Sequence, residues 1–124
     1  HVSNVTQLEQ ACVAHSCNYG TTHQEIAHLL NELYTRHAKR SLTNWCPTFD
    51  YCLLAIGKID GIINDGPELY DFSAGKLIAQ EAGAYVSDFQ NQPRAHDRIT
   101  RFLMSSTPQI QTELVNIMGT RTTA

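Results

Sequence analysis

Apolar positions along the chain follow two spacings in alternation. Short apolar runs bounded by turn residues are typical of buried strands, and they occur at residues 11–15, 59–63, 84–87 and 102–104. Apolar residues at helical spacing lie between and after them, and they predict helices from Thr22 to about Ala38, from Pro47 to Gly57, from Asp71 to Gly83 and onward from Pro108. This alternation predicts one α/β domain, a layered α-β-α arrangement around a mixed, largely buried sheet of four or five strands.

The first two helices have clear start signals. Thr22 with Glu25 forms a capping box, and Pro47 suits a first helical position. The predicted buried face of the first helix comprises Ile26, Leu29, Leu30, Leu33 and His37. That of the second helix comprises Phe49, Cys52, Leu53 and Ile56. Each helix is therefore expected to pack one apolar stripe against the sheet.

The third predicted helix contains the carboxylate of greatest interest, Asp71. Its apolar stripe is Ala74, Leu77, Ile78 and Ala82, and Gly83 suits the left-handed position beyond the helix end. Asp71 reads first as an N-terminal cap, because capping aspartates are common and metal ligands are rare. A carboxylate near a helix start stays ionised, however, and could also hold a hard cation such as Mg²⁺. The residues alone leave both roles open.

Composition narrows the class of protein. The chain has 124 residues, 42% of them hydrophobic, which is enough for one soluble domain with a core. A formal net charge of −3 argues against nucleic acid, and the short basic run Arg36–Arg40 reads as a solvated helix end. No apolar run is long enough for a membrane span, and no leader is evident. Four scattered cysteines suggest a reducing, cytoplasmic setting.

Few motifs suggest chemistry. The six histidines lack metal-binding spacing, and His15 lies near Cys12 and Cys17 in sequence without any pattern that makes a nucleophile–base pair. The remaining candidates form an acidic set around the 59–63 strand and the helix after it: Asp60, Asp65, Glu68 and Asp71. Ligand sites of α/β sheets form where strands end and helices start, so this set marks the best candidate edge.

Two blocks carry a family resemblance. Tyr70–Gly83 resembles the signature W-D-x-A-A-G-x-x-I-x-x-E-A-G-G of the inositol monophosphatase family, Mg²⁺-dependent sugar-phosphate phosphatases. The matching residues are Asp71, Ala74, Gly75, Ile78, Glu81, Ala82 and Gly83. Upstream, Leu53–Ile63 resembles the family segment VAxGrxDgy, with Ala55, Gly57 and Asp60 in register. Weaker likeness at both ends extends the resemblance over nearly the whole chain, but only to the C-terminal half of the family.

The resemblance implies a half-site. The family's N-terminal half, which holds a glutamate-bearing helix and a DPxDGTxxF loop, is absent from these 124 residues, and the chain opens at His1 without a methionine. The chain is therefore expected to be one domain, 1–124, from a longer phosphatase. By resemblance Asp71 is a metal ligand for Mg²⁺, while Cys46 and Asn64 lie near the substrate. No catalytic residue is assigned within the chain.

Departures from the family pattern limit the substrate prediction. Trp45 and Cys46 stand where the family has Gly and then Ser or Thr, and Asn64 stands where inositol-specific members have glutamate. The expected substrate is a small phosphorylated metabolite, hydrolysed only when the other half is present. The alternative is a noncatalytic relative that binds a partner or small ligand. Loss of the other half would expose helix-free sheet surfaces, so a homo-oligomer is expected.

Overall fold

The protein is a five-stranded sheet between two layers of helices. The computed structural model describes residues 1–17, 22–44, 46–66, 69–92 and 101–122. The strands are β1 (Cys12–Cys17), β2 (Arg40–Leu42), β3 (Gly61–Asp65), β4 (Tyr85–Ser87) and β5 (Arg101–Ser105). The helices are α1 (His23–Thr35), α2 (Pro47–Ala55), α3 (Leu69–Glu81) and α4 (Pro108–Thr122), and a 3-10 turn, η1 (Leu8–Gln10), precedes β1.

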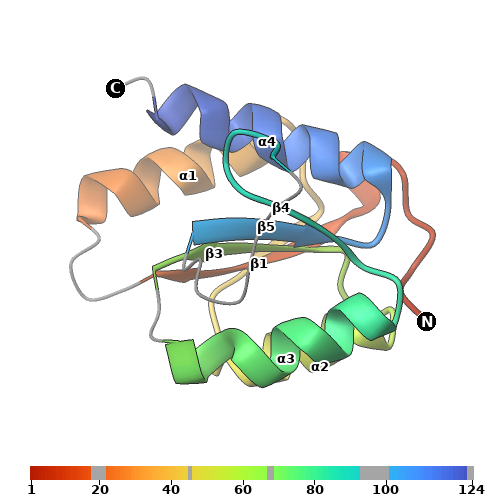
Figure 1. Cartoon of the computed structure of the whole chain (residues 1–124). Coiled ribbons are helices and arrows are strands. Elements are labelled where there is room, and N and C mark those ends of the chain that lie inside the picture. Colours follow the sequence, from red (N-terminus) through yellow and green to blue (C-terminus); the bar gives the residue numbers. More distant parts are fainter. Residues whose placement is uncertain (18–21, 45, 67–68, 93–100, 123–124) are drawn as a thin grey trace.

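The sheet is mixed, and both of its faces are covered. The strand order is β2-β1-β3-β5-β4; β1 pairs in parallel with β2 and β3, while β5 runs antiparallel to β3 and β4. Helices α1 and α4 lie on one face, and α2 and α3 lie on the other (Figure 1). The predicted fold class is confirmed with five strands. The expectation of helix-free sheet surfaces is wrong, because four helices cover the sheet.

The central strands β1 and β3 are apolar on both faces because each face has a helical layer above it. Val13 and Ile63 belong to the core beneath α1 and α4, whereas Ala14 and Ile62 belong to the core beneath α2 and α3. None of the four is more than 1% exposed. The alternation of side chains along a strand divides the interior into these two cores.

The first helix has its predicted start but an earlier end. The backbone N–H of Glu25 donates to Thr22 Oγ1 at 3.1 Å, and Thr22 N–H donates to Glu25 Oε2 at 3.2 Å, which confirms the capping box. The helix ends at Thr35, because His37 adopts a left-handed backbone with φ of 66° and is exposed instead of buried. Arg40 then begins β2, a short edge strand. The prediction that Arg36–Arg40 is a helix end therefore holds for Arg36, which caps α1, but not for Arg40.

Helices α2 and α3 turn different faces to the sheet from those predicted. In α2 the fully buried residues include Tyr51 and Leu54, while the predicted core residue Phe49 is 54% exposed. In α3 Leu77 and Ile78 are 58% and 48% exposed. Buried in α3 instead are Gly75, Lys76 and Ala79. The predicted stripe of α3 is wrong in orientation, because small residues allow a closer approach than Leu77 or Ile78 would. The predicted stripe of α2 is right in part, since Leu53 is half-buried and packs against this core.

Gly75 of α3 lies very close to Tyr51 of α2. A Cβ added at Gly75 would lie 2.8 Å from Tyr51 Cβ and from a ring carbon, well inside van der Waals contact. Tyr51 is itself fully buried and its ring stacks on Phe102 of β5 at a centroid distance of 6.3 Å. Because the ring cannot retreat into Phe102, position 75 tolerates only glycine without repacking.

We predict that Gly75→Ala destabilises the domain by about 1–2 kcal/mol, since the overpacking cost exceeds the gain in helix propensity. Gly119→Ala is the matched control. Gly119 lies in α4, and a Cβ added there meets no atom within 4 Å, so this change should be neutral or stabilising by up to about 1 kcal/mol. Urea unfolding of both variants measures the difference, and equal midpoints would contradict the close packing.

Candidate functional site

Three parallel strands place the candidate site at one edge of the sheet. β1, β2 and β3 all end at this edge, and each is followed by a helix that starts there: α1, α2 and α3 respectively. Parallel strand ends joined to helix starts are where open α/β sheets bind ligands. Ser16 of β1 pairs in register with Asn64 of β3, which sets Asn64 one residue from the end of its strand.

The acidic set predicted for this edge is divided between the two ends of β3. Asp65 is the last residue of β3, whereas Asp60 comes immediately before its first, so their Cα atoms are separated by about 16 Å of extended strand. Asp60 Oδ1 accepts from Ser3 Oγ at 2.5 Å, and its Oδ2 accepts from Cys12 N–H at 2.9 Å. Asp60 therefore ties the N-terminal segment and β1 together, and the prediction of one acidic edge is wrong for this residue.

Asp71 lies at the candidate edge, within the first turn of α3. The prediction that Asp71 itself caps the helix is wrong: α3 begins at Leu69, so Asp71 is its third residue. Gly66, directly after β3, adopts a left-handed backbone with a φ of 89°. A first-turn position still favours an ionised carboxylate through the helix dipole. Glu68 falls outside the described residues.

Asn64 is buried beneath the edge. Its side chain is 0% exposed, and Tyr51 Oη donates a hydrogen bond to its Oδ1 at 2.5 Å. Burial, with the Asp50 carboxylate as the second cause, raises the pKa of Tyr51 far above its ordinary value, so the phenol stays a neutral donor. The amide of Asn64 is thus held in one orientation. Its proposed contact with substrate stays a prediction.

Cys46 lies on the surface just before α2. It occupies the N-cap position, makes no capping hydrogen bond with its side chain, and carries a free thiol. The loop that holds it is fixed by Asn44, whose Nδ2 donates to Asp50 Oδ1 at 2.6 Å. The structure therefore puts Cys46 at the start of α2 and Asn64 near the end of β3, both on the side of the sheet where α3 begins.

Asp50 is a buried acid that the sequence did not single out. Its side chain is 0% exposed, and its Oδ2 has no hydrogen-bond partner among the described residues. Burial raises its pKa above the ordinary value, an effect that the hydrogen bond from Asn44 opposes. Tyr51, the next residue of α2, is also fully buried. Asp50 reads in the sequence as a helix first-turn acid, a position that is normally solvated, so its burial could not be foreseen.

Two basic side chains also approach this edge. Arg101 Nε lies 3.0 Å from Asp65 Oδ1, and the two residues are paired in register across β3 and β5. Lys76 of α3 is only 2% exposed, with its Nζ 4.6 Å from the centre of the Phe102 ring. A buried cation above an aromatic face is a stabilising arrangement. Lys76 was missed because the α3 stripe was assigned to the opposite side of the helix.

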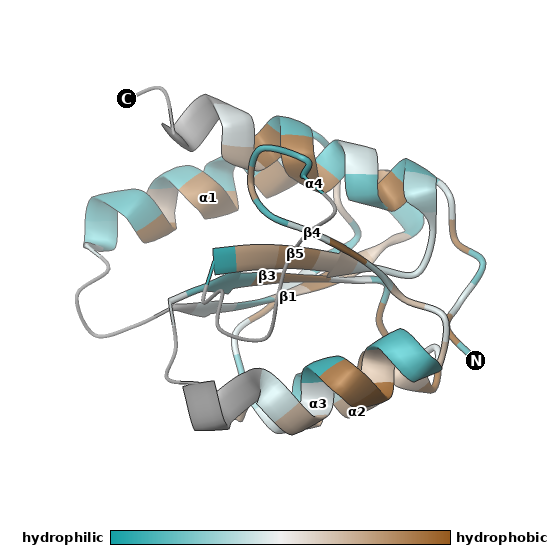
Figure 2. Ribbon diagram, in the orientation of Figure 1, coloured by the Kyte–Doolittle hydropathy of each residue, from teal (hydrophilic) through white to brown (hydrophobic). Residues whose placement is uncertain are grey.

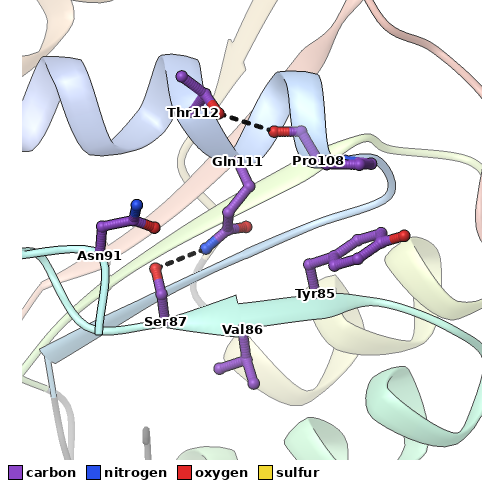
Figure 3. Close-up of a pocket in the computed structure, with 7 residues that line it drawn as sticks. All are labelled: Tyr85, Val86, Ser87, Asn91, Pro108, Gln111 and Thr112. Carbon is purple, nitrogen blue, oxygen red and sulfur yellow. Dashed lines mark hydrogen bonds between the residues drawn. The ribbon is translucent and has the colours of Figure 1, made fainter. Parts of the chain in front are cut away.

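A separate cavity of about 240 Å³ lies between β4 and α4. Gln111 projects into this region, where its Nε2 donates to Ser87 Oγ at 2.8 Å (Figure 3) and to the Leu103 carbonyl at 3.1 Å. Its Oε1 accepts from Ser105 Oγ at 2.7 Å. These bonds use both amide protons and one acceptor site of the buried Gln111 side chain. None of the predicted site residues lines the cavity.

The described residues do not form a complete metal site. Within the parts of the chain that the structure describes, no group of three or more His, Cys, Asp or Glu side chains is arranged to hold a metal ion. Carboxylate oxygen is the ligand type that Mg²⁺ prefers, so Asp71 has suitable chemistry. Its side chain lies outside those that the structure describes, so its role as a metal ligand stays a prediction. In the same parts, no helix is long and apolar enough to cross a membrane.

The fold is an α/β domain with three parallel strands whose ends, each followed by a helix start, mark the candidate edge. The profile of the inositol monophosphatase family matches residues 1–122, and the chain belongs to that family. Members of the family act on phosphorylated substrates and are generally metal-dependent. Family membership confirms the resemblance seen in the two sequence blocks.

Particular relatives match only in part of their length. The chain is 37% identical over 68 residues to Nus factor SuhB of Pasteurella multocida, covering 54% of this chain and 24% of that protein. It is 50% identical over 40 residues to Nus factor SuhB of Vibrio cholerae, covering 32% of this chain and 15% of that protein. The chain thus matches a quarter or less of these curated relatives.

Solved structures share the fold over almost the whole chain. The Thermotoga maritima IMPase superposes with a TM-score of 0.84 at 20% identity, covering 98% of this chain and 45% of that one. The extragenic suppressor protein suhB of Bartonella henselae gives a TM-score of 0.81 at 21% identity, covering 94% of this chain and 44% of that one. At these identities the likeness establishes the fold. The chain spans less than half of either structure.

The burial of Asp50 predicts how the free energy of unfolding changes with pH. Because the pKa of Asp50 is raised above 3.8 in the folded state, the folded protein binds this proton more tightly than the unfolded chain. The contribution of Asp50 to the unfolding free energy is therefore greatest at low pH and falls as pH rises from about 4 through the raised folded pKa. Asp50→Asn should remove this decline.

Urea unfolding between pH 4 and pH 7 measures this effect as the difference in slope between the wild type and the variant. Glu113→Gln in α4 makes the same chemical change at a residue that is not fully buried, and its slope should follow the wild type. A slope for Asp50→Asn that also follows the wild type would show that the acid does not titrate abnormally.

Proposed function

We propose that this chain is the C-terminal domain of a longer Mg²⁺-dependent phosphatase of the inositol monophosphatase family, acting on a small phosphate monoester. The observation that supports this proposal is the family match over residues 1–122 in a chain that spans less than half of solved structures with the same fold. Asp71 lies at the edge where β3 ends and α3 begins, and Asp60 is engaged at the opposite end of β3. An active site of this class would need further carboxylates from polypeptide outside the chain.

The chain's own contribution would be binding and orientation. Mg²⁺, when bound, supplies charge neutralisation for phosphoryl transfer. Asp71 would be one of its oxygen ligands, held in the first turn of α3. Cys46 at the start of α2 would lie near the substrate, and Asn64, oriented by Tyr51, would support that surface from below. On this proposal the 124-residue chain by itself does not hydrolyse phosphate esters.

The setting of the proposed enzyme is the cytoplasm, with a phosphorylated metabolite as its partner. Among the described cysteines, Cys12, Cys46 and Cys52 carry free thiols, as suits a reducing compartment. The net charge of −3 gives no electrostatic support for nucleic acid as a partner.

A second candidate is a noncatalytic relative that binds a partner. The observation in its favour is the apolar outer surface of α2 and α3, where Leu77 and Ile78 are about half exposed. Sequencing the complete gene separates the two candidates. Codons upstream of His1 for a glutamate-bearing helix and a DPxDGT loop favour the enzyme, and their absence favours the binding protein.

We predict that the protein expressed from the complete gene hydrolyses small phosphate monoesters only with Mg²⁺, and that Asp71→Asn lowers its turnover at least about 100-fold, as expected for losing a transition-state electrostatic group. Release of inorganic phosphate is the measurement. Glu113→Gln removes one charge on the opposite helical layer and should leave turnover unchanged. The 124-residue chain alone should release no phosphate with Mg²⁺. Robust turnover by that chain, lost on Asp71→Asn, would contradict the proposal.

A further inference from the structure

Arg101 lies at the same end of the sheet as Asp71. It is the first residue of β5 and is paired in register with Asp65, the last residue of β3. The start of β5 and the start of α3 lie at the same end of the sheet (Figure 1), and residues 66–68 alone separate Asp65 from α3. In Figure 2 the start of β5 is hydrophilic, whereas the middle of the strand is apolar. Arg101 therefore places a cation at the candidate edge.

Two contacts hold the guanidinium of Arg101 in place. Its Nε donates to Asp65 Oδ1 at 3.0 Å, and its Cζ lies 5.2 Å from the centre of the Phe89 ring. Both partners belong to the interior, since the Asp65 side chain is 7% exposed and Phe89 is 4% exposed. A charge-assisted hydrogen bond and a cation over an aromatic face both stabilise one position of the planar group. The guanidinium is therefore preorganised, which lowers the entropic cost of binding a ligand.

The same guanidinium keeps most of its hydrogen-bonding capacity. The side chain of Arg101 is 55% exposed, and a guanidinium has five N–H donors, of which Asp65 takes the one on Nε. Among the described residues, none accepts from the donors on Nη1 and Nη2. These two nitrogens form a fork that binds a carboxylate or a phosphate through two parallel hydrogen bonds. The side chain is thus oriented by the protein on one side and open to an oxyanion on the other.

The other described Lys and Arg side chains are not placed for this role. Lys76 approaches the candidate edge, but it is 2% exposed and its Nζ lies above the Phe102 ring. Four more lie at the opposite end of the sheet, where α1 ends and where β2 and β3 begin: Arg36, Lys39, Arg40 and Lys58. Among the Lys and Arg side chains that the structure describes, Arg101 is the exposed cation at the candidate edge.

Arg101 and Asp71 belong to opposite faces of the sheet. Side chains alternate along a strand, so Arg101 shares its face with Leu103, which belongs to the core beneath α1 and α4. Asp71 belongs to α3, in the layer on the other face (Figure 1). The chain from Asp65 to Leu69, which joins β3 to α3, spans at most about 14 Å. A phosphorylated metabolite of a few carbon atoms, bound at the end of β3, can therefore approach both residues.

We propose that Arg101 binds a second oxyanion of the substrate, a carboxylate or a second phosphate, while the ester phosphate lies on the Asp71 side of the edge. This inference rests on the proposed function for the reaction, and it goes further by naming the substrate class. Bound Mg²⁺ neutralises the phosphate that is transferred. A fixed, exposed guanidinium beyond the metal is matched to additional negative charge. The substrate is then a small phosphate monoester that carries a second anionic group.

Turnover of matched substrates by the complete gene product tests the proposal. 3-Phosphoglycerate has a carboxylate where glycerol 3-phosphate has a hydroxymethyl group, and glycerol 1,3-bisphosphate has a second phosphate there. We expect kcat/KM for at least one of the two more anionic esters to exceed that for glycerol 3-phosphate by about 10-fold or more, as for a hydrogen bond between charged groups. The ester with the larger kcat/KM identifies the oxyanion.

Substitution of Arg101 assigns the preference to its guanidinium. Arg101→Met should abolish the preference mainly by raising KM, because the second oxyanion takes no part in the chemical step. Arg40→Met removes an exposed arginine at the opposite end of the sheet and should keep the preference. The absence of a preference in the wild type, or a preference that survives in Arg101→Met, would overturn the proposal.

Chemical protection of the wild-type protein covers the case in which Arg101→Met does not fold. Phenylglyoxal modifies exposed guanidinium groups, and peptide-resolved mass spectrometry separates Arg101 from Arg40. With the ester in excess, 3-phosphoglycerate or glycerol 1,3-bisphosphate should slow modification of Arg101 at least about 5-fold, glycerol 3-phosphate should not, and Arg40 should be unaffected. Equal rates at Arg101 with all three esters would overturn the proposal. Protection without turnover of any ester would refute the proposed function alone, and turnover without protection would refute the role of Arg101 alone.

Discussion

The contact between Gly75 and Tyr51 determines the arrangement on which the candidate site depends. The backbone of α3 comes so close to the Tyr51 ring that even one methyl group at position 75 would overlap it. This contact fixes the rotation of α3 about its axis where Gly75 meets α2, so that Lys76 and Ala79 are buried. It also holds the Tyr51 ring against Phe102, with the phenol hydrogen-bonded to Asn64. One small residue thereby orders both the helix that carries Asp71 and the strand end that carries Asn64.

The same rotation explains why the apolar stripe of α3 lies outward. With Gly75 and Ala79 against the core, Leu77 and Ile78 must point away from it. Lys76 is carried inward to the Phe102 ring, an unusual place for a lysine in a helix that has an exposed side. The core beneath α2 and α3 is therefore filled mainly by Tyr51 and Leu54 of α2, while α3 contributes the small residues Gly75 and Ala79.

The order of strands and helices could be predicted from the sequence, but the orientation of two helices could not. The Thr22–Glu25 capping box and Pro47 at a helix start depend only on residues that are close in sequence. The sequence therefore predicts both helix starts correctly. In α3 both sides contain apolar or small residues, and periodicity cannot tell which side meets the sheet. The strand β2 was missed because Arg40–Leu42 is a short, partly polar edge segment without a strand signature.

The candidate site was predictable only in its position. Strand ends followed by helix starts indicated the correct edge, and the family blocks pointed to Asp71. The pairs Asn44–Asp50 and Tyr51–Asn64 could not be foreseen, because hydrogen bonds between buried side chains depend on tertiary packing. Asp60 was misassigned because the predicted strand, 59–63, included it, whereas β3 spans Gly61–Asp65 and leaves Asp60 at the opposite end from Asp65.

The central claim is that this domain supplies one side of a site completed by other polypeptide. The most direct measurement is a crystal structure of the complete gene product grown with Mn²⁺ in place of Mg²⁺, with the metal located by its anomalous scattering. The account predicts Mn²⁺ bound by the Asp71 carboxylate together with carboxylates from outside residues 1–124. Mn²⁺ bound away from Asp71 would contradict it.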